Sequence, residues 1–303
     1  MKNVTFEMIV KDIKNLGVLK GDLLNVKMSL KSMGNVDGGA KIVLDAILEV
    51  IGKEGTIVTD SFVPAHRLPL VSPRSRIVVD DNTPSYAGAL ANAMLEHPDV
   101  IRSQHPIQKF AAIGKLAKDL MLNHTPDSYA YDVLRRMSFM GGKNLKIGTD
   151  EKVVGVGTTH VAIGTLGFKQ KRPKAGVLYK AEDGKVELFQ RNWSGICEKG
   201  LIKFIPYYRE AGAILSEGLV GNAESKITDM GKTLDVELDL LKNDPRFFFC
   251  GDPLCDGCRL TWEFSEKKYA RFFFNSLRQR NWKRIVRVFL TNPIYEAINI
   301  FSK

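Results

Sequence analysis

The stretch KMSLKSMGNVDGGA, from Lys27 to Ala40, decides how the rest of the chain is interpreted. The apolar run Leu23 to Met28 predicts a buried strand that ends inside this stretch, and Gly38 to Ile51 predicts a helix with one apolar face. Thr56 to Thr59 predicts a second strand, which completes a β-α-β unit. Backbone N–H groups at a turn that opens a helix can bind an anion such as a diphosphate. An ordinary strand-to-helix turn has the same pattern.

Helical and extended patterns continue to alternate along the first half of the chain. Helices are expected in Thr5–Leu16, with Thr5 as the cap, in Ser85–His97 and in Lys115–Leu122. Two short apolar runs, Leu145–Ile147 and Val153–Val156, predict interior strands. This alternation favours an α/β fold, a three-layer αβα sandwich around a mixed central sheet. We treat residues 1–303 as a single domain.

Two basic segments and one long loop stand out from this pattern. Residues 167–195 are expected to form a basic flap with a hairpin around Glu182–Gly184. The polar loop Val63–Pro84 is long enough to suggest an active-site surface. The tail near 265–303 predicts a basic helix that packs its aromatic residues on the sheet. Weak contact with an anionic membrane surface is the alternative for this tail.

Composition and charge narrow the class of protein. The chain has 303 residues, 44% of them hydrophobic, and a formal net charge of +10. Because no apolar run reaches the roughly 18 residues that a transmembrane helix needs, we expect a cytoplasmic protein with no transmembrane segment. The positive charge favours anionic ligands. The sequence carries no nucleic-acid-binding motif, so no nucleic-acid partner is expected, and a homo-oligomer is compatible with it.

The cysteines allow two interpretations. Cys250, Cys255 and Cys258 lie in CGDPLCDGC, and Cys197 is the remaining one. The C-x4-C-x2-C spacing could hold zinc or part of an iron–sulfur cluster, with Cys197 as a fourth ligand. A second C-x2-C pair or a nearby histidine would complete such a site and is missing. Reduced thiols in a turn are therefore favoured, and no metal is expected.

Two long segments resemble the aminoglycoside 3-N-acetyltransferase family. The first is LGVLKGDLLNVKMSLKSMGNVDGGAKIVLDAILEVIGKEGTIVTDSF, and the second is NTPSYAGALANAMLEHPDVIRSQHPIQKFAAIGKLAKDLMLNH. The similarity is strong from Leu16 to Gly157 and faint from there to about Leu260. The resemblance implies an α/β fold unlike that of GNAT acetyltransferases. It also implies direct transfer of an acyl group from a coenzyme A thioester, as co-substrate, to a sugar amine without a metal.

The resemblance also implies roles for particular residues. Backbone amides of the turn would line the pyrophosphate and pantetheine of coenzyme A, with two further residues near the thioester: Ser29, Leu30, Lys31, Ser32, Met33, Arg102 and Ser103. The arginine can pair with a phosphate, although a surface ion pair is its alternative. The acceptor would lie against Phe62, Ser85 and Thr159.

The sequence departs from the family where the catalytic base is expected. In GVGTTHVAIGTLGF the place of the family's histidine falls at Thr165, and the place of its glutamate falls at Phe168. His160 lies five residues earlier, at the expected start of a helix, where the helix dipole disfavours the cationic form and suits a general base. It could equally cap or pack. His105 is a second catalytic candidate, with hydrogen bonding inside its own turn as the alternative.

Charge suggests which amine is acylated. Aminoglycosides are polycations, whereas basic residues are expected around the cleft loops: Arg67, Arg74, Arg76, Lys169, Lys171, Arg172 and Lys174. This favours N-acylation, by acetyl or a longer acyl group, of a nucleotide-linked aminodeoxy sugar for surface polysaccharide biosynthesis. The alternative is an aminoglycoside 3-N-acetyltransferase that confers antibiotic resistance. A third hypothesis is a non-catalytic protein that binds coenzyme A.

Overall fold

The computed structural model describes residues 3–148, 156–171, 174–191, 193, 195–265, 274, 277 and 278. Residues 153–155 of the second expected strand, Arg172 and most of the basic tail lie outside these ranges. Val156 is described and begins a helix, so the strand expected there is wrong at this residue. In the described part of the chain, no helix has both the length and the apolar character that a membrane span requires.

A mixed sheet of seven strands forms the centre of the fold. Its spatial order is β10 (Ile214–Val220), β11 (Ala223–Asp229), β7 (Lys143–Ile147), β1 (Leu23–Met28), β2 (Thr56–Asp60), β6 (Phe110–Gly114) and β5 (Ile101–Arg102). The three central strands β7, β1 and β2 are parallel, and the outer strands pair antiparallel. In the central register, Leu24 pairs with Ile57. The predicted mixed sheet is confirmed.

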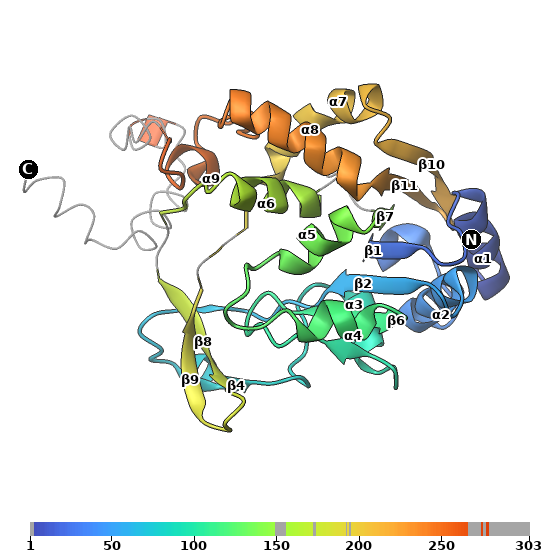
Figure 1. The fold of residues 1–303 in the computed structure, drawn as a ribbon, viewed down its shortest axis with the longest axis horizontal. Coiled ribbons are helices and arrows are strands. Elements are labelled where there is room, and N and C mark those ends of the chain that lie inside the picture. The colour runs from blue at the N-terminus through green and yellow to red at the C-terminus, as the bar shows by residue number, and fades with distance from the viewer. Residues whose placement is uncertain are drawn as a thin grey trace, which may run out of the picture.

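Helices cover both faces of this sheet (Figure 1). On one face pack α1 (Phe6–Asn15), α2 (Gly39–Ile51) and α3 (Ala89–Leu95); on the other pack α4 (Ala117–Leu122), α5 (Asp132–Phe139), α6 (Val156–Thr165) and α8 (Met230–Asn243). Alternate residues of β1 point to opposite layers: Leu24 belongs to the hydrophobic core on the face of α1 and α2, and Leu23 to the core on the face of α5 and α6. The three-layer sandwich predicted from the alternating pattern is therefore confirmed.

Local signals explain the helices that were predicted well. The Oγ1 atom of Thr5 accepts a hydrogen bond from the Met8 N–H at 3.4 Å, which caps α1 as expected. Helix α2 begins one residue after its predicted start and ends at Ile51. Helix α3 begins only at Ala89, because Ser85 and its neighbours form a turn: the Ala87 N–H donates to Ser85 Oγ at 3.0 Å.

A second, smaller sheet lies beside the carboxyl end of the central strands. It consists of β3 (His66–Arg67), β4 (Val78–Val79), β8 (Ala175–Lys180) and β9 (Val186–Gln190). Strands β8 and β9 form the expected hairpin, which projects from the body in yellow (Figure 1). The hairpin pairs with the long loop that contains β3 and β4, so the two segments act as one structure.

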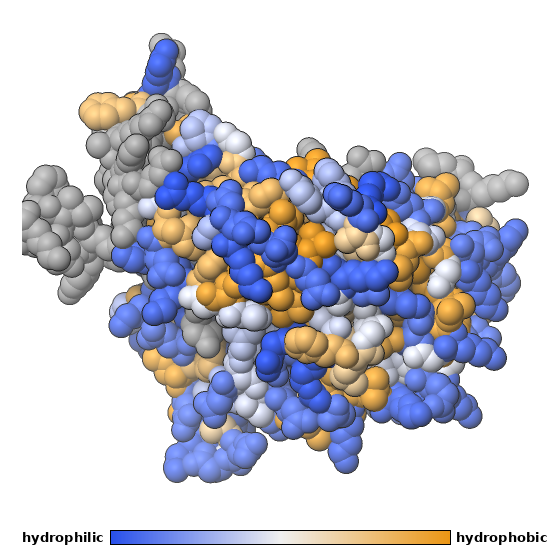
Figure 2. Space-filling view, turned by 45° about the horizontal axis from the view of Figure 1, so that its top comes forward, coloured by the Kyte–Doolittle hydropathy of each residue, from blue (hydrophilic) through white to orange (hydrophobic). Residues whose placement is uncertain are grey.

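The remaining helical segments are short. They are η1 (Leu30–Met33), η2 (Pro73–Arg76), η3 (Glu198–Phe204), α7 (Ile205–Glu210) and α9 (Asp256–Arg259). On the face turned toward the viewer in Figure 2, hydrophilic residues are spread over the surface with hydrophobic residues between them.

Candidate active site

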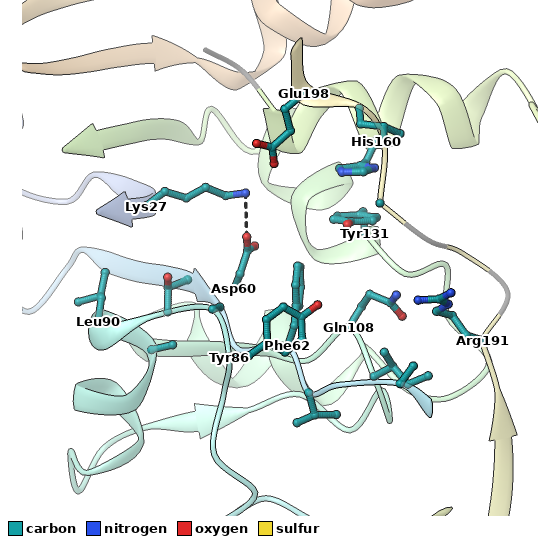
Figure 3. Close-up of a pocket in the computed structure, with 18 of the residues that line it drawn as sticks. Lys27, Asp60, Phe62, Tyr86, Leu90, Gln108, Tyr131, His160, Arg191 and Glu198 are labelled. Carbon is teal, nitrogen blue, oxygen red and sulfur yellow. Dashed lines mark ion pairs between the residues drawn. The ribbon is translucent and has the colours of Figure 1, made fainter. Parts of the chain in front are cut away.

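A cavity of about 410 Å³ opens at the carboxyl ends of β1 and β2. Ligands of open α/β sheets bind at this edge, because loops rather than strands occupy the space beyond the strand ends. The polar and aromatic lining residues include Lys27, Asp60, Phe62, Tyr86, Gln108, Tyr131, His160, Arg191 and Glu198 (Figure 3). They come from segments that are far apart in the sequence.

An ion pair lies on the floor of the cavity. Lys27, near the end of β1, places its Nζ atom 2.7 Å from Oδ2 of Asp60, the last residue of β2. The parallel pairing of the two strands brings these residues together. The second oxygen of Asp60, Oδ1, is buried and has no hydrogen-bond partner among the described residues. It can accept a hydrogen bond from a ligand.

His160 forms part of the cavity wall. It lies in α6, its ring stacks on Tyr131 with centroids 4.0 Å apart, and its Nδ1 atom accepts a hydrogen bond from Trp193 Nε1 at 3.1 Å. The pKa of His160 is lowered to about 3, mainly by burial and secondly by the charge of Lys27. The imidazole is therefore neutral at physiological pH. Because an indole N–H can only donate, Nδ1 is unprotonated and the ring proton is on Nε2.

Aromatic residues hold this wall in place. The Tyr129 hydroxyl donates to the backbone oxygen of His160 at 2.7 Å. Phe62 contacts Tyr131 edge to face, with centroids 6.0 Å apart. Burial raises the pKa of Tyr131 well above its usual value, so this hydroxyl stays protonated. The cavity thus has an aromatic side, and Glu198 lies next to its His160 (Figure 3).

The turn expected to bind coenzyme A lies at the same edge of the sheet, directly after β1. It forms the 3₁₀ segment η1 (Leu30–Met33), in which Ser32 Oγ donates to the Gly148 backbone oxygen at 2.9 Å. The Ser29 and Ser32 hydroxyls also share a hydrogen bond of 2.9 Å. Met33 is fully buried, so only its backbone can contact a ligand, whereas Lys31 is exposed. The five residues Ser29 to Met33 flank the cavity without lining it.

Arg102 has a different role from the predicted one. Its guanidinium donates to three backbone oxygens, those of Asp81, Thr83 and Ser61, at 2.8, 2.6 and 2.7 Å. The side chain is buried and fastens the long loop to the end of β2. A phosphate would have to displace these bonds, so the predicted contact with coenzyme A does not fit the structure.

His105 and Ser103 are also buried away from the cavity. His105 Nδ1 accepts from the N–H groups of Ile107 and Gln108 at 3.2 and 3.0 Å, which is the hydrogen bonding inside its own turn that was the alternative. Its ring stacks on His124 at 4.9 Å, and burial is the largest cause that lowers its pKa to about 3. Ser103 Oγ accepts from the Phe110 N–H at 2.9 Å. Both residues stabilise the loop before β6 and do not reach the cavity.

Of the three predicted acceptor-binding residues, only Phe62 lines the cavity. Ser85 Oγ donates to the Phe62 backbone oxygen at 3.1 Å and so shapes the loop. Thr159 points between α6 and α8, where its hydroxyl donates to Glu237 Oε1 at 2.5 Å. Glu237 is fully buried and also accepts from the Tyr208 hydroxyl. These contacts fix α6, and therefore His160, against α8.

Several cavity residues were not predicted. Asp60 directly follows the predicted strand Thr56–Thr59 and ends the observed β2, and a carboxylate at that position is a recognisable sign of a site at the edge of a parallel sheet. Arg191 and Glu198 follow the hairpin, and Tyr131 precedes α5; none of these has a local pattern that marks it. Trp193 was missed because its hydrogen bond to His160 depends on tertiary structure.

Comparisons with known proteins agree with the fold. A family described as aminoglycoside 3-N-acetyltransferase matches residues 26–242. Aminoglycoside N(3)-acetyltransferase VIII of Streptomyces fradiae is 30% identical over 160 residues, which cover 48% of this chain and 56% of that protein. Aminoglycoside N(3)-acetyltransferase III of Serratia marcescens is 32% identical over 161 residues, which cover 48% of this chain and 59% of that protein. The chain therefore spans little more than half the length of these relatives.

Solved structures extend the likeness to most of the chain. Aminoglycoside acetyltransferase AAC(3)-IIb superposes with a TM-score of 0.70 and 27% identity over 80% of this chain and 98% of that one. YokD of Bacillus subtilis superposes with a TM-score of 0.70 and 24% identity, over 81% of this chain and 96% of that one. A complex described as AAC-IIIb binary with CoASH superposes with a TM-score of 0.67 and 20% identity, over 80% of this chain and 97% of that one. The last two identities support the fold alone.

Proposed function

Because this chain belongs to the aminoglycoside 3-N-acetyltransferase family, we propose that it transfers an acetyl group from acetyl-CoA to an amine of an amino sugar. The cavity at the ends of β1 and β2 is the main support. It combines a neutral hydrogen-bond donor, His160, with two carboxylates, Asp60 and Glu198, next to the turn that resembles the family's coenzyme A site. These groups suit a reaction between a thioester and an amine.

The donor would enter along η1. This turn lies at the same edge of the sheet as the cavity, and exposed Lys31 can pair with the diphosphate of coenzyme A. Backbone N–H groups of Ser29 to Met33 would bind the same diphosphate. The thioester would then reach the cavity beside Lys27 and Met28, the residues that connect η1 to the cavity.

His160 would stabilise the developing oxyanion. In the tautomer that the Trp193 hydrogen bond requires, Nε2 carries the proton and can donate it in a hydrogen bond to the thioester oxygen. A general base would instead need a free lone pair at Nε2. We therefore assign His160 as a hydrogen-bond donor, in place of the base expected from its position.

Glu198 would bind the acceptor amine and receive its proton. Its exposed carboxylate faces the cavity near Lys27 (Figure 3). As the amine nitrogen attacks the thioester carbon, the C–N bond forms and the C–S bond breaks. The amine gives up one proton to Glu198, which passes it to the departing thiolate, so that coenzyme A leaves as the thiol and the carboxylate is regenerated. Proximity of the two substrates supplies much of the rate enhancement.

The names of the relatives favour an aminoglycoside acceptor over the nucleotide-linked sugar expected from charge. Asp60 is neutralised by Lys27, and Glu198 and Arg191 carry opposite charges, so the described part of the cavity holds no acidic cluster. Arg191 is the specific feature that keeps a nucleotide-linked amino sugar as a second candidate, because its guanidinium can pair with a diphosphate.

Release of free coenzyme A thiol, measured with acetyl-CoA and a panel of amines, tests these proposals. The panel contains aminoglycosides and nucleotide-linked amino sugars. Turnover with aminoglycosides supports the first acceptor class, and turnover with nucleotide-linked sugars alone moves the assignment to the second. Tight coenzyme A binding with no turnover on any amine would leave only a binding protein and overturn the proposed activity.

A further inference from the structure

The four cysteines converge at one point, although Cys197 lies far from the other three in the sequence. The Sγ atoms of Cys197, Cys250, Cys255 and Cys258 all lie within 4.8 Å of one another, and all four are free thiols. We propose that they bind one Zn²⁺ ion as a structural site. The proposal takes up the alternative in which Cys197 completes the C-x4-C-x2-C group, in place of the favoured interpretation of reduced thiols in a turn.

The distances fit a single tetrahedral ion. Zinc binds thiolate sulfur at about 2.3 Å, so the sulfurs of a regular tetrahedron lie about 3.8 Å apart. The Sγ atoms of Cys250 and Cys258 are 3.8 Å apart. A four-iron cluster places its cysteine sulfurs on different irons and needs a wider cage. Four soft thiolate ligands in a tetrahedron are typical of zinc.

The backbone holds the thiols in this arrangement. The Cys250 N–H donates to Cys258 Sγ at 3.4 Å, and the Cys258 N–H donates to the Cys255 backbone oxygen at 3.2 Å. A side chain at Gly200, three residues after Cys197, would come within 2.0 Å of the Phe248 backbone oxygen. This close approach requires glycine and brings the two segments together.

Nearby cations suit the charge of the occupied site. Four thiolates and one Zn²⁺ ion leave a net negative charge, after the thiol protons have been released to solvent. Arg259 Nη2 donates to the Cys250 backbone oxygen at 2.8 Å, and Lys203 Nζ donates to the Phe249 backbone oxygen at 2.6 Å. Cys250, Cys255 and Cys258 are buried, which shields their bonds to the ion from water.

The ion would support the active-site cavity without taking part in chemistry. Four protein ligands leave it no open position. Ile196 and Glu198, the neighbours of Cys197, both line the cavity, and Trp193 lies just before them. Zinc would thus fasten this wall of the cavity to the segment around Cys255, which follows it in the chain only after η3, α7, β10, β11 and α8.

Metal content of the full-length protein tests the proposal independently of any acyltransferase activity. We expect about one zinc per chain after expression with zinc, and four thiols that react fully with a thiol reagent only after chelation. Replacement of zinc by Co²⁺ should give the visible bands of a tetrahedral cobalt–thiolate site. Iron in place of zinc, cysteines that react freely in the native protein, or a zinc content near zero would each overturn it.

Two variants separate loss of the site from loss of the fold. Cys197→Ser removes the partly exposed ligand and should lower the zinc content at least tenfold after dialysis against a weak chelator, with the far-UV circular dichroism retained. Asp256→Asn changes an exposed residue of the same turn and should keep zinc at the wild-type level. Equal zinc content in wild type and Cys197→Ser would contradict the assignment of Cys197 as a ligand.

Discussion

Trp193 donates a hydrogen bond of 3.1 Å from Nε1 to Nδ1 of His160, and this bond leaves the ring proton of the imidazole on Nε2. It also joins α6 to the segment that carries Glu198. This segment is tied in turn to the loop before β6, because Gln108 Nε2 donates to the Trp193 backbone oxygen at 3.3 Å. The orientation of the histidine therefore depends on a residue that does not itself line the cavity.

Trp193→Phe should lower kcat by about tenfold with a small change in the KM for acetyl-CoA, because the aromatic packing is retained while the tautomer is no longer fixed. Steady-state kinetics measures both parameters. Trp262→Phe is the matched control: the Nε1 of Trp262 is buried and has no partner among the described residues, so this change removes no hydrogen bond of that kind. Equal kcat in the two variants would show that the bond does not position His160.

The pH dependence distinguishes a donor from a base. Because the pKa of His160 is lowered to about 3, the ring stays neutral from pH 5 to 9 and should add no ionisation to kcat/KM near 6.5. His160→Ala should lower kcat by about 10²- to 10³-fold at every pH, through loss of the oxyanion donor, and leave the shape of the profile unchanged. A limb near pH 6.5 that disappears in this variant would identify a general base instead.

The fold was predictable because its signals are local. Strand β1 has the predicted bounds, and α2 differs by one residue, since apolar periodicity reports directly on burial. The active site was less predictable, because the same residue type has several uses. Arg102 could pair with phosphate, but three backbone oxygens that the tertiary fold brings together take its guanidinium instead. His160 was identified by an expected place at a helix start, whereas it is the fifth residue of α6 and its tautomer depends on Trp193.

The cysteine cluster was also only partly predictable, because one of its members is brought in by the tertiary structure. The spacing of Cys250, Cys255 and Cys258 is visible in the sequence, but a three-ligand pattern is incomplete. The position of Cys197 beside them depends on how η3 packs against the C-terminal segment, for which the sequence has no local signal.

The ion pair on the cavity floor should contribute to stability. Lys27→Met leaves the carboxylate of Asp60 nearly buried and without its cation, and should lower the free energy of unfolding by about 1–2 kcal/mol, as measured with urea. Adding Asp60→Asn should recover part of this loss, because no charge is then left unpaired. Lys115→Met, which breaks the exposed pair with Glu54, should have a much smaller effect. If the double variant Lys27→Met/Asp60→Asn is less stable than Lys27→Met alone, the loss of stability does not come from the unpaired carboxylate of Asp60.

Glu237 should make the protein less stable as pH rises. Burial raises its pKa from 4.5 to about 8, so the folded state keeps a proton that the unfolded state has already released between these values. Its contribution is fully present below about pH 4.5 and is lost as pH rises through about 8, with a slope near 1.4 kcal/mol per pH unit. Glu237→Gln keeps the acceptor for Thr159 and should remove this slope in urea unfolding measured from pH 5.5 to 8.

Glu217→Gln is the matched control for this slope. Hydrogen bonds from Arg209 and Lys226 lower the pKa of Glu217, so this carboxyl is ionised in both the folded and the unfolded state above pH 5.5. Its replacement should therefore change stability by the same amount at every pH in the range. If the wild type and Glu237→Gln lose stability in parallel as pH rises, Glu237 is ionised in the folded protein, and the hydrogen bonds of Thr159 and Tyr208 to it would then stabilise a buried charge.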